Sequence, residues 1–330
     1  MLACRGHHPD GVFLALFSGF LACMGGFRMR LLRCLLISGS AAVAAGSLML
    51  AGEAVISTAA AAPAHSAGQP SAQFLARARA ALVGYLEANH PAPPIDSGVP
   101  GAPTVDAHAK SAPVDSSATG SFNWSGYADT STASGTFTEV SGQWKTPKVT
   151  CTKEDELTAA WVGLDGFSNA TVEQDGTLGW CFEGQATYFT WWEMYPADLI
   201  YVGNSLRPGD MITARVSRTG PSYTLSVADA THKGNGFSVK QTCGTCDNNS
   251  AEWILERPAF GSTGIAPLAD YHSWTLSNAT ETASGKKGTI SSYSPVQKID
   301  MVDSTDTYVL NTTSGLTGGS KFTTHWQDSY

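Results

Sequence analysis

The chain has 330 residues, with 28 Asp and Glu against 20 Lys and Arg and a formal net charge of −8 at pH 7. This length allows one large domain or two ordinary ones. The acidic balance, with no basic stripe, excludes nucleic acid as an expected partner. From Ser121 onward 22 Asp and Glu face 13 Lys and Arg. Such an excess suits a secreted protein that works in acid, because low pH removes the repulsion between carboxylates.

The N-terminal region has the pattern of a secretory signal peptide. Arg28, Arg30 and Arg33 precede or open an apolar run over residues 31–62, which ends among small Ala and Ser residues. A basic segment, an apolar segment and a small-residue cleavage site are the three parts of such a signal. We therefore expect residues 29–64 to be removed and the mature protein to be secreted.

A membrane anchor is the competing interpretation of the same run, since it is long enough to span a bilayer. Gly, Ser and Ala dilute its hydrophobicity and Glu53 interrupts it, which favours a cleaved signal. We expect no stable membrane association after processing. Residues 1–28 precede a well-formed signal that starts at Met29, and we interpret them as a start-site artefact or an extended basic region.

Residues 65–120 resemble a pro-segment in composition, being rich in Ala, Pro, Ser and Gly. Within them the spacing of apolar residues predicts one short helix, whose apolar face would consist of Phe74, Leu75, Ala78, Leu82, Tyr85 and Leu86. A short helix beside a Pro-rich tract cannot form its own core. We expect the segment to act as the protein's own inhibitor, with Arg77 and Arg79 covering an acidic cleft until low pH protonates its carboxylates.

Residues 121–330 have the pattern of an all-β domain. Alternating runs occur at 136–140, 211–216 and 223–227, and turn residues interrupt the chain about every ten positions. No long helical period is present in this region. The pattern predicts an antiparallel β-sandwich.

Four cysteines lie in this domain, an even number that suits an oxidising compartment. Cys243 and Cys246 form a C-x-x-C pair, but the chain lacks the second pair or the nearby histidines of a zinc site and the βαβ context of a redox motif. We expect no metal and two structural disulfides, Cys151–Cys181 and Cys243–Cys246, although four cysteines allow three pairings.

Several common hydrolase motifs are absent from the sequence. There is no H-E-x-x-H or G-x-S-x-G motif, and the only Asp-Ser/Thr-Gly triplet, at 96–98, lies in the Pro-rich tract. Only three histidines follow residue 121, none beside a recognisable nucleophile. Carboxylates and amides therefore remain as the candidate catalytic groups.

Five ordered motifs contain such groups together with aromatic residues: NWSGY from Asn123, AWVGLDG from Ala160, TVEQDGT from Thr171, WWEMYP from Trp191 and AEWILERP from Ala251. Alternation along AEWILERP places Trp253 and Leu255 on one face and Glu252, Ile254 and Glu256 on the other. In order and content the five motifs resemble the glutamic peptidases, the eqolisin family, and especially its bacterial branch.

The resemblance implies a concanavalin A-like or jelly-roll β-sandwich with a concave substrate-binding face. It implies a catalytic dyad of Gln174 and Glu256, and substrate-binding roles for Trp161, Asp165, Trp191 and Glu193. No cofactor is implied. The expected activity is hydrolysis of polypeptides by a secreted, pepstatin-insensitive, monomeric endopeptidase. Because an ordinary carboxyl group would serve as the base, an acid optimum is expected.

Two other function classes suit the same residues. A carbohydrate-binding sandwich would also present Trp and carboxylates on a concave sheet. A glycoside hydrolase would use Glu193 and Glu256 as its carboxylate pair. Gln174 distinguishes the classes, because a glycosidase has no need of it.

Overall fold

We analysed a computed structural model of the protein, which describes residues 70–88, 117–203, 206–260, 264–303 and 308–329. The expected signal peptide and most of the Pro-rich tract lie outside these residues. No helix within the described ranges is long and apolar enough to cross a membrane.

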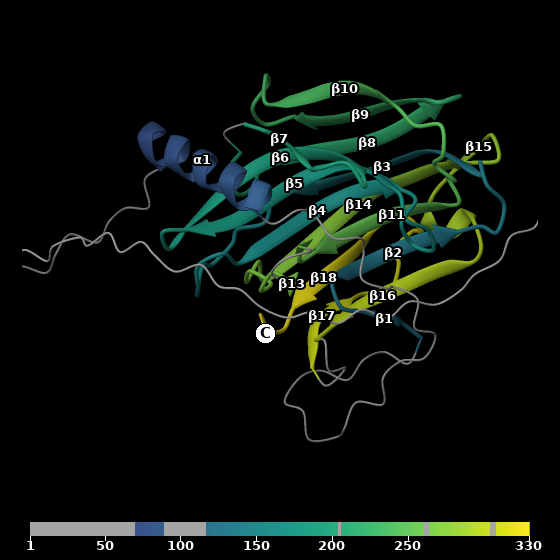
Figure 1. Cartoon of the computed structure of the whole chain (residues 1–330). Helices are drawn as coiled ribbons and strands as arrows, with labels where there is room; N and C mark the ends of the chain where they lie inside the picture. The colour runs from purple at the N-terminus through teal and green to yellow at the C-terminus, as the bar shows by residue number, and fades with distance from the viewer. Residues whose placement is uncertain (1–69, 89–116, 204–205, 261–263, 304–307, 330) are drawn as a thin grey trace, which may run out of the picture. The chain divides into compact units, whose positions relative to one another are not determined.

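The described part of the chain is almost entirely β-structure (Figure 1). The one α-helix, α1, spans Ala72–Ala88, and a single 3-10 turn, η1, spans Ile290–Ser292. The first nine strands are β1 (Thr119–Ser121), β2 (Trp124–Thr130), β3 (Phe137–Lys145), β4 (Leu157–Leu164), β5 (Val172–Phe182), β6 (Gln185–Tyr195), β7 (Ile200–Val202), β8 (Met211–Thr219) and β9 (Ser222–Asp229). The remaining strands are β10 (Gly236–Thr242), β11 (Ser250–Glu256), β12 (Ala259–Phe260), β13 (Gly264–Ile265), β14 (Ser273–Ala283), β15 (Lys286–Gly288), β16 (Val296–Val302), β17 (Val309–Thr313) and β18 (Phe322–Trp326). The alternating runs predicted near residues 136, 211 and 223 thus fall in strands.

Fourteen strands of the described chain form one hydrogen-bonded path that folds into two layers, β1 and β15 pair at its sides, and β12 and β13 form a separate two-stranded sheet. We call the run β16-β2-β11-β4-β5-β6-β7 the site layer and the run β10-β9-β8-β3-β14-β18 the opposite layer; β17 joins them. All pairings along this path are antiparallel, and only β1 pairs in parallel, with β16. The predicted antiparallel β-sandwich is confirmed.

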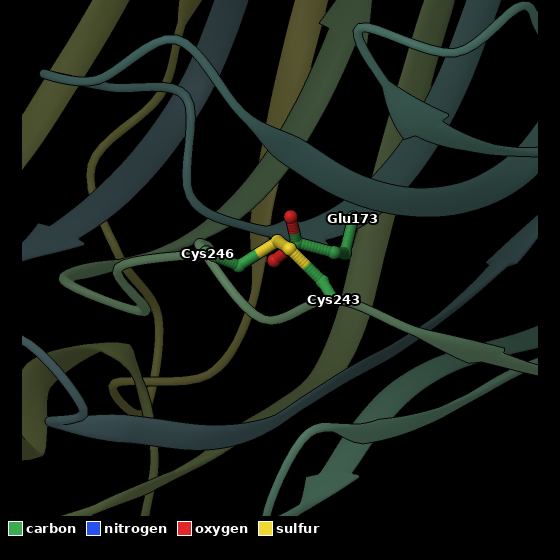
Figure 2. Close-up of side chains that lie close together, drawn as sticks. All are labelled: Glu173, Cys243 and Cys246. Carbon is green, nitrogen blue, oxygen red and sulfur yellow. A yellow bond between two sulfur atoms is a disulfide. The ribbon is translucent and has the colours of Figure 1, made fainter.

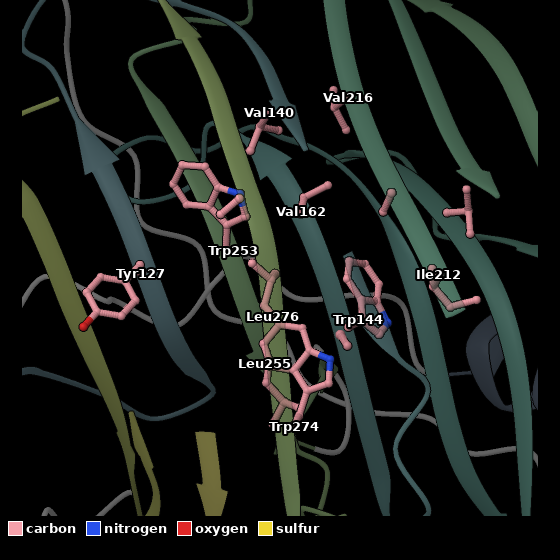
Figure 3. Packing of buried hydrophobic residues seen from close by; sticks show 14 of the residues in the cluster. Tyr127, Val140, Trp144, Val162, Ile212, Val216, Trp253, Leu255, Trp274 and Leu276 are labelled. Atoms are coloured by element: carbon pink, nitrogen blue, oxygen red, sulfur yellow. The ribbon is translucent and has the colours of Figure 1, made fainter. Parts of the chain in front are cut away.

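A hydrophobic core fills the space between the layers (Figure 3). Trp253 and Leu255 of β11 enter it and are fully buried, as the alternation predicts. Two indole nitrogens also cross the gap: Trp253 Nε1 donates to Ser141 O at 2.9 Å, and Trp144 Nε1 donates to Thr177 Oγ1 at 3.1 Å. Buried indoles need such partners, so these two bonds fix how the layers face each other.

The outer face of the site layer carries a second buried cluster, which we call the outer cluster. It contains Trp124, Trp161, Trp180, Phe189, Trp191 and Ile254, together with Phe74, Ala78 and Leu82 of α1. The predicted helix therefore buries its apolar face on this side of the sheet. Of the residues expected on that face, Phe74, Ala78 and Leu82 are almost fully buried, and Leu75 and Tyr85 are partly buried.

Both predicted disulfides are present. Cys151 and Cys181 are bonded with their Cα atoms 5.5 Å apart, and Cys243 and Cys246 with theirs 5.8 Å apart. The first closes the segment that contains β4 and most of β5. The second lies in the connection from β10 to β11, immediately before the strand that ends in Glu256.

Candidate active site

Strand register brings the candidate residues to one face of the site layer. On β5, Gln174 lies opposite Glu193 of β6 and Gly163 of β4. On β11, Glu256 lies opposite Ala159 of β4. Residues paired across neighbouring strands point to the same face. Gln174, Glu193 and Glu256 therefore share the outer face, together with Trp161 and Trp191.

The carboxyl group of Glu256 is held by hydrogen-bond donors on both oxygens. Trp161 Nε1 donates to Oε2 at 2.8 Å, and Asn123 Nδ2 donates to Oε1 at 3.1 Å. Burial raises the pKa of Glu256 to about 7, and hydrogen bonds from Trp161, Trp124 and Asn123 oppose that rise. Donors that stabilise a carboxylate keep it available as a base.

Glycine residues explain how Trp161 reaches Glu256. A Cβ atom at Gly176, across from Trp161 on β5, would lie 2.7 Å from the Trp161 Cβ and 2.1 Å from the Ala160 carbonyl oxygen. A Cβ atom at Gly163 would lie 2.9 Å from the six-membered ring of Trp161. Both contacts are too close for any side chain. The edge of the Trp124 ring packs on Trp161 at 5.0 Å between ring centroids and completes its support.

Gln174 is buried and bonded to a carboxyl group. Its Nε2 donates to Glu193 Oε2 at 2.6 Å. Burial, and then the charge of Glu256, raise the pKa of Glu193 to about 8, and the Gln174 hydrogen bond opposes this. Glu193 is thus linked to both members of the predicted dyad, by a hydrogen bond to one and by electrostatic repulsion with the other.

The buried polar atoms on this face that have no hydrogen-bond partner among the described residues include Gln174 Oε1, Glu193 Oε1 and Trp191 Nε1. Buried polar groups are normally satisfied, and exceptions mark places where water or a ligand binds. One acceptor of the amide, one carboxyl oxygen and one indole donor are therefore available to a substrate.

Asp165 occupies a different position from the other predicted residues. It is fully buried just after β4, in a left-handed backbone conformation with φ of 69°. Its carboxylate accepts hydrogen bonds from the backbone N–H of Asn248 at 2.7 Å and of Asn249 at 2.9 Å, and from Asn169 Nδ2 at 2.8 Å. These bonds fasten the start of β11. Among the described residues none of its hydrogen bonds goes to Gln174 or Glu256.

The sequence assigned no role to Asn123 or Trp124, but both residues contact Glu256. Both belong to the NWSGY motif, and β2 pairs with β11 so that Trp124 lies opposite Glu256. Glu252 is fully buried rather than solvated, although a charged residue on an outer strand face is ordinarily exposed. Burial raises its pKa well above the usual range.

Two other groups of side chains could hold a metal ion by their spacing. One comprises Asp210, Asp229 and His232. The other comprises Glu173, Cys243 and Cys246, but its two sulfur atoms are joined in a disulfide and offer no thiolate to a metal, so it is not a metal site. Neither includes Gln174, Glu193 or Glu256. The residues predicted for the site thus bring two carboxyl groups, the Gln174 amide and the indoles of Trp161 and Trp191 to the outer face.

The part of the chain that contains these residues matches a known protein family. The family model described as the peptidase A4 family matches residues 122–326, well over half of the chain. Aspergillopepsin-2 of Aspergillus niger is 32% identical over 151 residues, which are 44% of this chain and 51% of that protein. The match thus spans about half the length of this curated relative.

Two solved structures share the fold. Scytalido-glutamic peptidase with a transition state analog inhibitor has a TM-score of 0.54 and 21% identity, covering 62% of this chain and 98% of that one. SCP-B, a member of the eqolisin family in a complex with the tripeptide Ala-Ile-His, has a TM-score of 0.52 and 18% identity over the same shares. At these identities the likeness establishes the architecture alone.

Proposed function

Since the chain belongs to the peptidase A4 family, the glutamic peptidases, we propose that it hydrolyses peptide bonds with Glu256 as general base and Gln174 as the oxyanion donor. One observation carries the proposal. Glu256 is held at both oxygens by Asn123 and Trp161, and Gln174, on the same sheet face, is held by Glu193. Each group is oriented by its own neighbours before a substrate binds, which is what preorganised catalysis requires.

The proposed reaction starts with Glu256 as a carboxylate. It removes a proton from water as the water attacks the scissile carbonyl carbon, and later delivers this proton to the departing amine. Burial raises its pKa to about 7, and partial exposure to water and the two donors, Trp161 and Asn123, oppose that rise. We propose that its ionised form is populated on the acidic side of neutrality, where the enzyme would work.

Gln174 has two N–H groups, and Glu193 accepts one of them. The second is available to the oxyanion of the tetrahedral intermediate, and the unpartnered Oε1 can accept a hydrogen bond from the attacking water. Because the pKa of Glu193 is raised to about 8, Glu193 is neutral in acid. It can then orient the amide without placing a second negative charge beside the oxyanion.

Polypeptides are the proposed substrates, and Trp161, Trp191 and Glu193 would line their site. The unpartnered Trp191 Nε1 is a donor suited to a peptide carbonyl. Asp165 would act from a distance, by fastening β11. The proposed protein is a secreted monomer, in keeping with its two disulfides.

Helix α1 would hold the proposed enzyme inactive until it is removed. Leu82 and Ala78 are fully buried in the outer cluster that also contains Trp161 and Trp191. Arg77 pairs with Glu183 at 2.7 Å, and Arg79 lies 5.4 Å from the centre of the Tyr201 ring. The Arg77–Glu183 pair is exposed, so it contributes little. Low pH alone would leave the apolar contacts intact, and cleavage of the segment is the more effective route to activation.

Replacing Glu256 with Gln tests the proposed function. Glu256→Gln keeps size and hydrogen-bonding capacity but removes the base. We expect hydrolysis of an unfolded protein at acid pH, with pepstatin present, to fall by at least about a hundred-fold. Glu252→Gln is the matched control on the same strand, and it should retain activity.

Mass spectrometry of the products identifies peptide-bond cleavage by the new N-termini, and circular dichroism shows that each variant is folded. Near-wild-type cleavage by folded Glu256→Gln would refute the proposed function. A glycoside hydrolase would instead be favoured if the wild type released sugar from an oligosaccharide and cleaved no peptide, and if Glu256→Gln lost the sugar release.

A further inference from the structure

Glu173 is a buried carboxyl group that the proposed peptidase mechanism does not use. It precedes Gln174 on β5, so its side chain points to the opposite face of the strand, into the molecule. Figure 2 shows it beside the Cys243–Cys246 disulfide. One carboxyl oxygen of Glu173 and the two sulfur atoms all lie within 4.8 Å of one another. Such a group close to a disulfide can exchange a proton with a departing sulfur.

Glu173 lies beside the carboxyl group of Asp165, and the two groups differ in their hydrogen-bond donors. Asp165 accepts two backbone N–H groups, from Asn248 and Asn249, whereas neither oxygen of Glu173 accepts a hydrogen bond from an amide or hydroxyl donor of the described chain. Donors stabilise the charged form of a carboxyl group. Because no such donor stabilises a negative charge on Glu173, its carboxyl group retains a proton.

Other charges around Glu173 do not reverse this arrangement. Burial, followed by the charge of Asp165, raises the pKa of Glu173 to about 10, and Arg218 lowers it by a smaller effect. Burial is the main cause of the raised pKa of Tyr223 and of Glu252, and the proximity of Glu173 adds to both shifts. Glu173 consequently holds a proton throughout the acid and neutral range.

The neighbouring disulfide is accessible to an incoming thiol. Cys243 and Cys246 are only partly buried, and Gly244 and Thr245 between them are exposed. Cys181 of the other disulfide is fully buried. A reductant from solution can therefore approach Cys243–Cys246 from outside while Glu173 lies on its inner side.

We propose that Cys243–Cys246 is a thiol–disulfide exchange site for dithiol reductants, in which Glu173 supplies the proton to the departing thiolate. A dithiol thiolate attacks one sulfur, the Cys243–Cys246 bond breaks, and the released cysteine takes the carboxyl proton of Glu173. The second thiol of the dithiol loses its proton to solvent and attacks the dithiol sulfur of the mixed disulfide, which frees the other cysteine to take a proton from solvent. The protein disulfide gains two electrons and two protons, the dithiol becomes a disulfide, and Glu173 regains its proton from solvent. This site is independent of the proposed peptidase chemistry.

Reduction of the folded protein by dithiothreitol tests the proposal. Samples are quenched in acid at intervals, alkylated and digested, and mass spectrometry measures each disulfide separately. We expect Glu173→Gln to slow the reduction of Cys243–Cys246 about ten-fold or more, because an amide can donate a hydrogen bond but cannot release a proton. The reduction of Cys151–Cys181 should be unchanged in the same samples. Glu252→Gln, a matched change of another buried carboxyl group, should leave both rates unchanged.

A second measurement needs no variant. In deuterium oxide, with rates calculated per dithiothreitol thiolate, the wild-type reduction of Cys243–Cys246 should slow relative to that of Cys151–Cys181, because a proton is transferred at the first site. Equal reduction rates in folded Glu173→Gln and wild type would overturn the proposal. Identical isotope effects at the two disulfides would overturn it as well.

Discussion

At the scale of single residues, Trp161 helps to set the pKa of Glu256. Its indole nitrogen donates the shorter of the two hydrogen bonds to that carboxyl group, at 2.8 Å. Trp161→Phe keeps the aromatic ring and removes the donor. A hydrogen bond to a charged group contributes about 1.5–3 kcal/mol, so the pKa of Glu256 should rise by about 1–2 units. The acid limb of the kcat/KM profile should move to higher pH by the same amount.

Trp191→Phe is the matched control for this measurement, because Trp191 Nε1 has no partner among the described residues. It should change KM and leave the acid limb in place. An unmoved limb in Trp161→Phe would mean that another group than Glu256 governs the profile.

The sequence allowed part of this site to be predicted. The resemblance assigned Gln174 and Glu256, and it indicated Trp161 and Glu193 as neighbours. It did not indicate that Trp161 and Asn123 hold Glu256, because that contact depends on the pairing of β2 and β4 with β11 across more than 90 residues of chain. The burial of Glu252 was likewise hidden, since alternation shows which face a residue takes and not what covers that face.

At the scale of elements, α1 is expected to block the site through its apolar face. Leu82→Asp places a charge in the outer cluster and forfeits the burial of a leucine, worth about 2–3 kcal/mol. Docking should weaken by roughly a hundred-fold or more, and the uncleaved protein should become active. Arg77→Ala removes only an exposed ion pair and should keep the uncleaved protein latent.

Activity of uncleaved protein, verified by its mass, measures this effect. Equal latency in Leu82→Asp and wild type would show that α1 is not the inhibitor.

The existence of this helix follows from apolar spacing alone, and the strands follow from alternation. The strand order does not follow from the sequence, because residues 284–330 lie beyond the five motifs and supply β16, β17 and β18, of which β17 joins the two layers.

At the scale of the whole molecule, buried carboxyl groups make the fold sensitive to alkali. Burial, with a contribution from Glu281, raises the pKa of Asp129 to about 10, and burial raises that of Glu281 to about 7. Burial also raises the pKa of Asp175. Between pH 4 and these values the folded protein binds more protons than the unfolded chain. Its stability is therefore complete below about pH 4 and declines as pH rises.

Each such group lowers the free energy of unfolding by about 1.4 kcal/mol per pH unit, between its pKa in the unfolded chain and its pKa in the folded protein. The melting temperature should fall by roughly 10 °C or more from pH 4 to pH 8, as measured by calorimetry. Asp129→Asn needs no proton and should flatten this decline, whereas Asp247→Asn, at an exposed position, should not. A melting temperature that rises between pH 4 and pH 8 would contradict the prediction.

The measurement that tests the central claim most directly is the kcat of Gln174→Glu on a peptide substrate. The substitution removes the amide donor. The new carboxyl group would face Glu193 and, when ionised, repel the oxyanion. We predict that kcat falls about a thousand-fold or more, most completely at the pH where the new group is charged, with little change in the circular dichroism spectrum. Gln174→Asn keeps an amide on a side chain that is one methylene group shorter, so it should retain more activity. A folded Gln174→Glu variant with kcat near that of the wild type would contradict the Gln174–Glu256 dyad.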